Sequence, residues 1–317
     1  MFYCNGQAIF NKNAIIIENG DSINYDKWVD IYNWSSNYGY PGMNSIFIVK
    51  DPGNIKNYYM IHNRIRYNGP GLMSSVHLIY SEFRERGVDE LEIVTKKNQN
   101  LYDSIPILSC YLSTISSRQN EGWWVVQPLQ NDSIFLTYYI GKEGIIRFPN
   151  QNTHQFFDSY RSSASGTARF SPEGKKYALY NYYDQLHIYD FDRQTGILYN
   201  HKKIIIHENV DRERYNFSGI EWSPSSRFIY TSSEEWLHQV DLENDFEVML
   251  IDTFKGVLDP FPSVFSHMAL GPDCRIYICP QSGTNSYHVI NKPNEKGTAC
   301  DFVPNGIKLP LPSGAGS

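Results

Sequence analysis

The feature that most constrains the fold of this chain is a repeat of about 50 residues in its second half. Three segments align, residues 168–192, 220–243 and 268–293, and each reads as strand, turn, strand, turn, strand. Their turn prolines, Pro172, Pro224 and Pro272, lie 52 and then 48 residues apart. A period of this length with about four short strands per unit is typical of β-propeller blades and not of helical repeats.

Each repeat carries further matching positions. A basic residue follows the proline by three positions, and a histidine on the third predicted strand is followed three positions later by Asp or Asn. The basic residues are Lys175, Arg227 and Arg275, and the pairs are His187/Asp190, His238/Asp241 and His288/Asn291. Blade strands are buried on both faces, so we do not expect a clean alternation of polar and apolar residues.

The composition agrees with strands and turns. The chain has 24 Tyr, 17 Phe and 6 Trp among 317 residues, and these types favour strands. Upstream, strands 45–50 and 58–62 flank the turn sequence Asp51-Pro52-Gly53-Asn54. Residues 81–92 could form a short helix or a hairpin loop. We predict an all-β fold, a β-propeller of six or seven four-stranded blades with seven preferred, as a single domain over 1–317.

Charge and patterning exclude several classes of protein. The net charge is −6 with no basic cluster, so we expect no nucleic acid partner. No apolar run is long enough for a membrane helix, so we expect no membrane insertion. The sequence contains no G-x-S-x-G, H-E-x-x-H or phosphate-loop motif. It therefore indicates no cofactor and names no catalytic residues.

Four stretches of sequence carry a resemblance to a known group of proteins. They are LGPDCRIYICPQSGTNSYHVINKPNEKGTACDFVPNGIKLP, FYCNGQAIFNKNAIIIENGDSIN, ARFSPEGKKYALYN and IYDFDRQTGIL. Together they resemble the closing, opening and middle blades of secreted β-propeller proteins of bacteria that use type IX secretion. The resemblance implies a WD-repeat-like or lactonase-like propeller, usually one module of a longer protein that ends in a sorting domain. It implies no catalytic residues.

The resemblance also sets expectations about location. The first residues lack the basic and apolar regions of a signal peptide. Because the resembling proteins are exported, we expect an upstream signal and interpret 1–317 as a fragment of a longer secreted polypeptide. The predicted location is the outer-membrane surface or the medium, with the periplasm as an alternative.

Aromatic residues in polar segments are the candidate ligand-binding residues. A Ser/Asn/Gly-rich stretch near the N-terminus holds four of them, and two tryptophans follow a second polar segment. They are Trp28, Trp34, Tyr38, Tyr40, Trp123 and Trp124. Exposed aromatic faces suit sugar rings or peptides because they offer a large rigid area at low entropic cost. Ordinary packing between blades is the alternative interpretation.

The cysteines allow one disulfide in an exported protein. Cys274, Cys279 and Cys300 lie within 27 residues. Cys274 and Cys279 are five positions apart on a predicted strand and should point to opposite faces. We therefore predict that Cys300 pairs with Cys274 or Cys279, with buried free thiols as the alternative.

Other polar groups favour structural roles. The repeated histidines could converge on a metal, yet they belong to the third strand of each blade, away from the channel-lining first strands, and we interpret them as structural. The run from Asp190 to Gly196 lacks key positions of a calcium loop and reads as a hairpin turn. Glu234 and Glu235, or His154 with Asp158, could supply an acid or base, but such pairs are common.

The leading functional interpretation is a non-enzymatic binding module that recognises a protein or glycan through loops on one propeller face. The first alternative is a hydrolase or lyase that acts on a small ester or polysaccharide in the central channel, from residues contributed by different blades. The second alternative is a structural spacer between other domains. The missing catalytic motifs favour binding over catalysis.

Overall fold

The computed structural model describes residues 2–4, 8–23, 45–67, 73–85, 93–130, 132–154, 166–213, 216–280 and 284–313. The chain divides into two compact units, which we describe one at a time. Unit 1 comprises residues 1–159 and 193–196, and unit 2 comprises residues 160–192 and 197–317. The prediction of a single domain stays a prediction.

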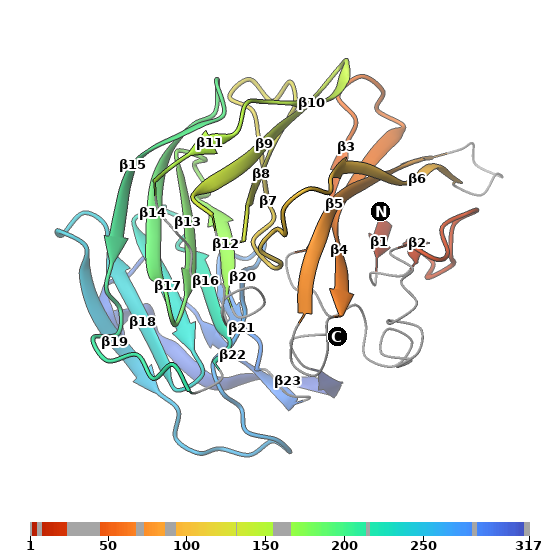
Figure 1. Ribbon diagram of the computed structural model, residues 1–317. Helices are drawn as coiled ribbons and strands as arrows, with labels where there is room; N and C mark the ends of the chain where they lie inside the picture. Colours follow the sequence, from red (N-terminus) through yellow and green to blue (C-terminus); the bar gives the residue numbers. More distant parts are fainter. Residues whose placement is uncertain are drawn as a thin grey trace. The chain divides into compact units, whose positions relative to one another are not determined.

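Unit 1 contains a two-stranded hairpin and two larger antiparallel sheets (Figure 1). The hairpin pairs β1 (Phe2–Cys4) with β2 (Ile9–Asn11). The first of these sheets consists of β3 (Ile46–Lys50), β4 (Asn57–Tyr67), β5 (Met73–Arg84) and β6 (Ile93–Tyr102). The second consists of β7 (Ser113–Ser116), β8 (Trp123–Pro128), β9 (Ile134–Gly141) and β10 (Gly144–Arg147). The short strand β11 (Gln151–Asn152) also pairs with β9.

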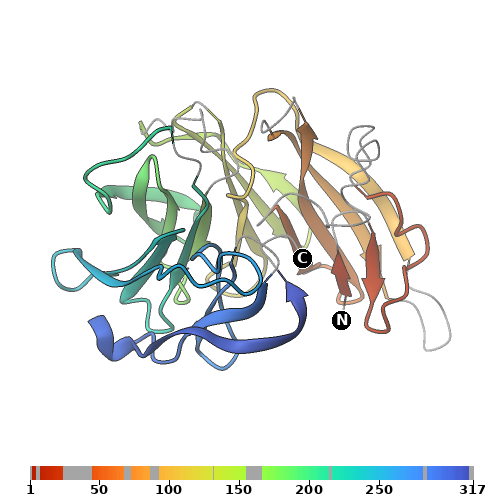
Figure 2. The same cartoon turned by 90° about the horizontal axis from the view of Figure 1, so that it is seen from below.

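Unit 2 contains three four-stranded antiparallel sheets, each built from strands in chain order. Figure 2 shows them from below, with the last sheet in blue. They are β12 (Thr167–Phe170), β13 (Lys176–Asn181), β14 (Gln185–Asp192) and β15 (Ile197–Ile204), then β16 (Ser218–Trp222), β17 (Phe228–Ser233), β18 (Trp236–Asp241) and β19 (Glu247–Thr253), then β20 (Met268–Leu270), β21 (Ile276–Ile278), β22 (Thr284–Ile290) and β23 (Phe302–Ser313). A short 3-10 helix, η1 (Gly297–Cys300), precedes β23.

The repeat predicted from the sequence corresponds to these three sheets. Each turn proline lies between the first and second strand of its sheet, where Ser171 and Ser223 close the turn by backbone hydrogen bonds. Strands β13 and β17 are buried almost throughout, so both faces pack against neighbours and the side chains do not alternate in exposure. The all-β prediction is therefore confirmed.

The cores explain why the sheets stack. Side chains of β13 and β14 pack against β16 and β17, with Tyr180, Ile188 and Trp222 in one buried cluster. The other face of β17 packs against the last sheet through Phe228, Tyr230 and Met268.

The number of blades and the structure of residues 81–92 can be compared with the predictions. The described residues contain four four-stranded sheets, one five-stranded sheet and the β1–β2 hairpin, so the predicted six or seven blades are not confirmed. The segment expected to be a helix or hairpin loop begins as strand, because β5 continues to Arg84. Within the described residues, the structure has no helix long and apolar enough to cross a membrane.

Candidate functional site

The first strands of the three sheets of unit 2 lie beside one another and bring polar groups together. Hydrogen bonds join their edges: the Ile220 amide donates to Thr167 Oγ1 over 3.1 Å, and Trp222 Nε1 donates to the Arg169 carbonyl over 3.2 Å. The Leu270 amide of β20 donates to Glu221 Oε2 of β16 over 3.2 Å. Arg169 of β12 and Glu221 therefore lie at a junction of three strands.

Glu221 is a buried carboxylate surrounded by donors. Its Oε1 accepts from the Trp222 amide over 2.9 Å, and its Oε2 lies 3.4 Å from Arg169 Nε. Burial raises the pKa of the Glu221 carboxyl above its ordinary value, and the Arg169 guanidinium partly offsets that rise. All partners of the Glu221 carboxylate are hydrogen-bond donors, so the arrangement favours the ionised carboxylate. The carboxylate in turn holds the Arg169 guanidinium in place.

His267 lies at the start of β20, close to the same junction. The segment Ser266–His267 runs against Gly219 of β16, where a Cβ would come within 3.0 Å of the His267 Cα atom. Both ring nitrogens of His267 are buried without a hydrogen-bond partner, although the residue as a whole is partly exposed. Burial, with a smaller effect from the charge of Arg169, lowers the pKa of His267 to about 3.

Arg169, Glu221 and His267 have complementary chemical properties. His267 is neutral at physiological pH and is therefore unprotonated when water arrives, although a pKa of about 3 makes it a weak base. Arg169 offers a fixed positive charge that can stabilise a developing oxyanion. Glu221 is an anchor that orients Arg169. Buried ionisable groups with shifted pKa values, such as Glu221 and His267, are a recognised mark of a functional site.

Sequence reasoning missed all three residues. Arg169 and Glu221 occupy the same position of the repeat, three residues before Pro172 and Pro224. A charged residue at one repeated position of otherwise apolar strands was the signal that could have found them. His267 lies just outside the aligned segment 268–293, so the repeat gave no signal for it.

The repeated histidines lie on the third strand of each sheet, as predicted, and each has its own surroundings. His187 Nε2 contacts the Asp184 carbonyl at 3.0 Å, and its Nδ1 lies 2.9 Å from His201 Nε2. His238 packs against the ring of His207, and His288 Nδ1 accepts from the Asn305 amide over 3.0 Å. Among the described residues, no three His, Cys, Asp or Glu side chains form a group that could hold a metal.

The predicted aromatic residues are only partly described. Trp28, Trp34, Tyr38 and Tyr40 lie outside the described residues. Trp124 is buried, packs on Tyr139 and donates from Nε1 to the Arg193 carbonyl over 2.7 Å, so its ring does not belong to an exposed surface. Ligand binding at the partly exposed Trp123 stays a prediction.

The predicted disulfide is not formed in the structure. Cys274, Cys279 and Cys300 are all free, with Cys274 exposed in a turn and Cys300 buried in the core of unit 2. Burial raises the pKa of the Cys279 thiol to about 11 and also raises that of Cys300, as expected for inert buried thiols. The alternative of free thiols therefore describes the structure.

The other acid and base candidates have structural surroundings. Glu234 Oε1 accepts from the Phe217 amide over 3.3 Å, and Glu234 forms an isolated bridge with Phe265. Asp190 lies beside Lys176 and Asn200 within its own sheet. His154 is exposed, and its proposed partner Asp158 lies outside the described residues.

Comparisons with known proteins show the fold. No protein-family model matches the chain, and no curated protein matches its sequence. A solved structure of a Lactobacillus plantarum protein is 13% identical, with a TM-score of 0.51 over 81% of this chain and 70% of that chain. A Bacteroides uniformis protein assigned as a 6-phosphogluconolactonase is 12% identical, with a TM-score of 0.49 over 84% and 85%. The periplasmic gluconolactonase of Pseudomonas aeruginosa is 10% identical, with a TM-score of 0.46 over 82% and 69%.

The fold of this chain is all-β, built from antiparallel sheets, and solved β-propeller proteins are among the structures that match it. The leading functional prediction is corrected by the same comparisons. Against a non-enzymatic binding module, the similar structures include a gluconolactonase and proteins assigned as 6-phosphogluconolactonases. Because likeness at these identities shows the fold alone, the reaction has to be argued from residues.

Proposed function

We propose that the chain is a hydrolase of small esters and that Arg169, Glu221 and His267 form its reaction centre. The observation that carries the proposal is the neutral, unpartnered imidazole of His267 beside a guanidinium that a buried carboxylate holds in place. These are the parts that ester hydrolysis needs without a covalent intermediate, namely a base for water and a positive charge for the oxyanion.

The reaction then proceeds in two steps. His267 takes a proton from water as the water oxygen attacks the ester carbonyl carbon, and the negative charge that develops on the carbonyl oxygen is stabilised by Arg169. The tetrahedral intermediate collapses with cleavage of the carbon–oxygen bond, and protonated His267 returns the proton to the leaving oxygen. The products are a carboxylic acid and an alcohol. For a cyclic ester both groups remain in one hydroxy acid.

Glu221 acts through Arg169 and is therefore a positioning residue. Its carboxylate accepts hydrogen bonds from Arg169 Nε and from one backbone amide each of β16 and β20. This fixes the guanidinium at the strand junction before substrate arrives. Preorganised charge of this kind lowers the barrier because it need not reorient during the reaction.

The test is to incubate the purified chain with a panel of esters and to measure hydrolysis as the acid that is released. Lactones, the substrates that the names of the similar gluconolactonases indicate, belong in the panel together with simple acyclic esters. We expect His267→Asn to lower kcat by about 10²–10⁴-fold, the usual contribution of a general base. The exposed His154 supplies the matched control, since His154→Asn should leave kcat unchanged.

The pH profile gives an independent readout. A base works only when it is unprotonated, and the pKa of His267 lies at about 3. The rate should therefore show no fall near pH 6.5, the ordinary pKa of histidine, and should stay level over the acidic range in which the protein stays folded. Absence of turnover on every ester, or equal rates for wild type and His267→Asn, would reject the proposal.

Export through type IX secretion is a second proposal, and it is supported by the sequence resemblance. It predicts that antibodies against the chain detect the protein on intact cells of the source organism. A protein or glycan partner likewise stays a prediction.

A further inference from the structure

The loop between β19 and β20 is the light-blue segment that follows β19 in Figure 1. It exposes a group of apolar side chains. Val257, Leu258 and Phe261 are 43%, 67% and 54% exposed, and Pro260 and Pro262 are exposed beside them. We call residues 257–262 the apolar tip. Isolated exposed apolar residues are common, but several adjacent ones on one loop mark an interaction site.

The apolar tip is held in one conformation by hydrogen bonds. The Ser263 amide donates to the Val257 carbonyl over 3.0 Å, and the Asp259 amide donates to the Phe261 carbonyl over 2.9 Å. The Asp259 carboxylate accepts from Ser286 Oγ over 2.7 Å and ion-pairs with Lys308 Nζ at 2.8 Å. Because the loop is already ordered, little conformational entropy is lost when it binds.

Moving the apolar tip out of water costs little free energy, because few of its polar groups would lose a hydrogen bond. Its one ionisable side chain, Asp259, binds the body of unit 2 and does not compete for the outer surface. Pro260 and Pro262 have no amide hydrogen, and the Asp259 amide is paired within the loop. Few backbone donors therefore need a partner when the tip is buried in an apolar medium.

Two lysines flank the base of the apolar tip. The side chains of Lys255 and Lys308 are 65% and 71% exposed, each with one acidic partner. An apolar tip with an aromatic ring and flanking lysines matches the layered chemistry of a lipid interface. There the acyl chains receive apolar groups and the phosphates receive ammonium groups.

We propose that the apolar tip inserts into the interfacial region of a phospholipid bilayer and docks the protein on a membrane surface. The occupant is a lipid bilayer and not a second protein, because lysine ammonium groups at the base and apolar groups at the end fit the depth profile of a bilayer. This shallow docking departs from the sequence-based expectation of no membrane insertion, which rested on the missing long apolar run and on a net charge of −6 without a basic cluster.

The test is co-sedimentation of the purified chain with vesicles of phosphatidylcholine, and with vesicles of equal parts phosphatidylcholine and phosphatidylglycerol. We expect binding to both, stronger to the anionic vesicles because Lys255 and Lys308 approach the phosphates. The double substitution Leu258→Asp and Phe261→Asp should reduce the bound fraction about tenfold or more. The matched control is Ile55→Asp in unit 1, an apolar residue 78% exposed on a turn, and it should bind as wild type does.

A second variant guards against a folding defect. In Phe261→Trp the apolar tip is kept, and the emission of the new indole should shift to shorter wavelength when vesicles are added. Urea midpoints of all variants should match that of wild type, because the substituted side chains contact solvent. The proposal is overturned if wild type stays in the supernatant with both vesicles, or if the double Asp variant sediments as much as wild type.

Discussion

Gly219 controls how closely β20 approaches β16. A Cβ at this position would lie 2.5 Å from the Ser266 carbonyl oxygen and 3.0 Å from the His267 Cα atom. Both neighbours are backbone atoms, so neither can rotate away. The missing side chain lets the segment before β20 lie against β16 and brings His267 to the strand that carries Glu221.

Gly219→Ala should therefore weaken both the fold and the site. Overpacking against backbone costs about 1–3 kcal/mol in the free energy of unfolding, which a urea titration will measure. Ester hydrolysis should fall at the same time because His267 moves. Gly256→Ala separates backbone strain from overpacking, since its φ of +76° strains a side chain while no atom lies within 4 Å of the added methyl group; it should lose some stability but keep full activity. An unchanged kcat/KM in Gly219→Ala would show that the close approach does not matter for the reaction.

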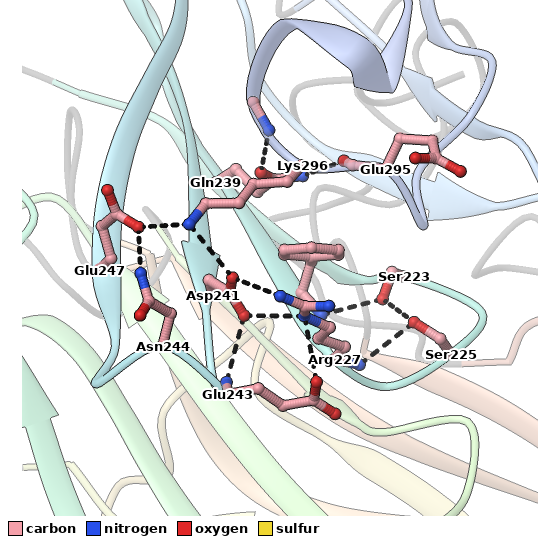
Figure 3. A network of polar contacts seen from close by, with 12 residues as sticks. Ser223, Ser225, Arg227, Gln239, Asp241, Glu243, Asn244, Glu247, Glu295 and Lys296 are labelled. Atoms are coloured by element: carbon pink, nitrogen blue, oxygen red, sulfur yellow. Dashed lines mark hydrogen bonds and ion pairs between the residues drawn. The ribbon is translucent and has the colours of Figure 1, made fainter.

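At the scale of elements, an ion-pair network joins β17, β18, β19 and the segment before η1 (Figure 3). Arg227 binds both oxygens of Asp241, at 2.9 and 2.8 Å. Lys296 lies 2.6 Å from Glu247 and 3.6 Å from Asp241. The Asp241 side chain is 0% exposed, so its charge depends on these partners. Hydrogen bonds from Arg227 above all hold the pKa of Asp241 below its ordinary value.

The repeat supplies a matched pair of variants for this network. Arg227→Ala should clearly lower the urea midpoint of unfolding, because a buried carboxylate loses two charged hydrogen bonds. Arg275 occupies the equivalent repeat position, but its partner Asp273 is exposed. Arg275→Ala should therefore leave the urea midpoint almost unchanged. Equal losses in the two urea titrations would refute the role assigned to Asp241.

At the scale of the whole molecule, many histidines are buried in neutral form. Burial lowers the pKa of His62, His187 and His267 to about 3 and that of His207, His238 and His288 to about 4. An unfolded histidine has a pKa of about 6.5, so between these values the unfolded chain binds more protons than the folded chain. The stability that these residues contribute is complete above about pH 6.5 and is lost as the pH falls toward 4.

Acid should thus unfold this protein earlier than is usual. A fully buried histidine such as His62 should contribute about 2 kcal/mol of destabilisation at pH 5. Urea titrations at pH 7.5, 6.5 and 5.5, followed by tryptophan fluorescence, should give steadily lower midpoints. A midpoint that stays constant over this range would mean that the histidines are not buried in neutral form.

The sequence by itself determined the strands and turns of unit 2. Pro172, Pro224 and Pro272 mark turns whose formation depends on neighbouring residues, and the repeated strand pattern follows from local propensity and burial. The pairing of consecutive strands then follows, because short turns force neighbours to lie side by side. This local logic gave the all-β fold and placed the repeated histidines on third strands.

Only the tertiary structure decided which strand edges meet. The Leu270 amide that binds Glu221 comes from a different sheet, and Trp222 reaches Arg169 of a third sheet. Nothing within one repeat encodes these contacts, because they depend on how whole sheets stack. The burial that sets the charge states of Glu221 and His267 likewise depends on atoms distant in sequence. The candidate site could therefore be found only once the sheets were seen together.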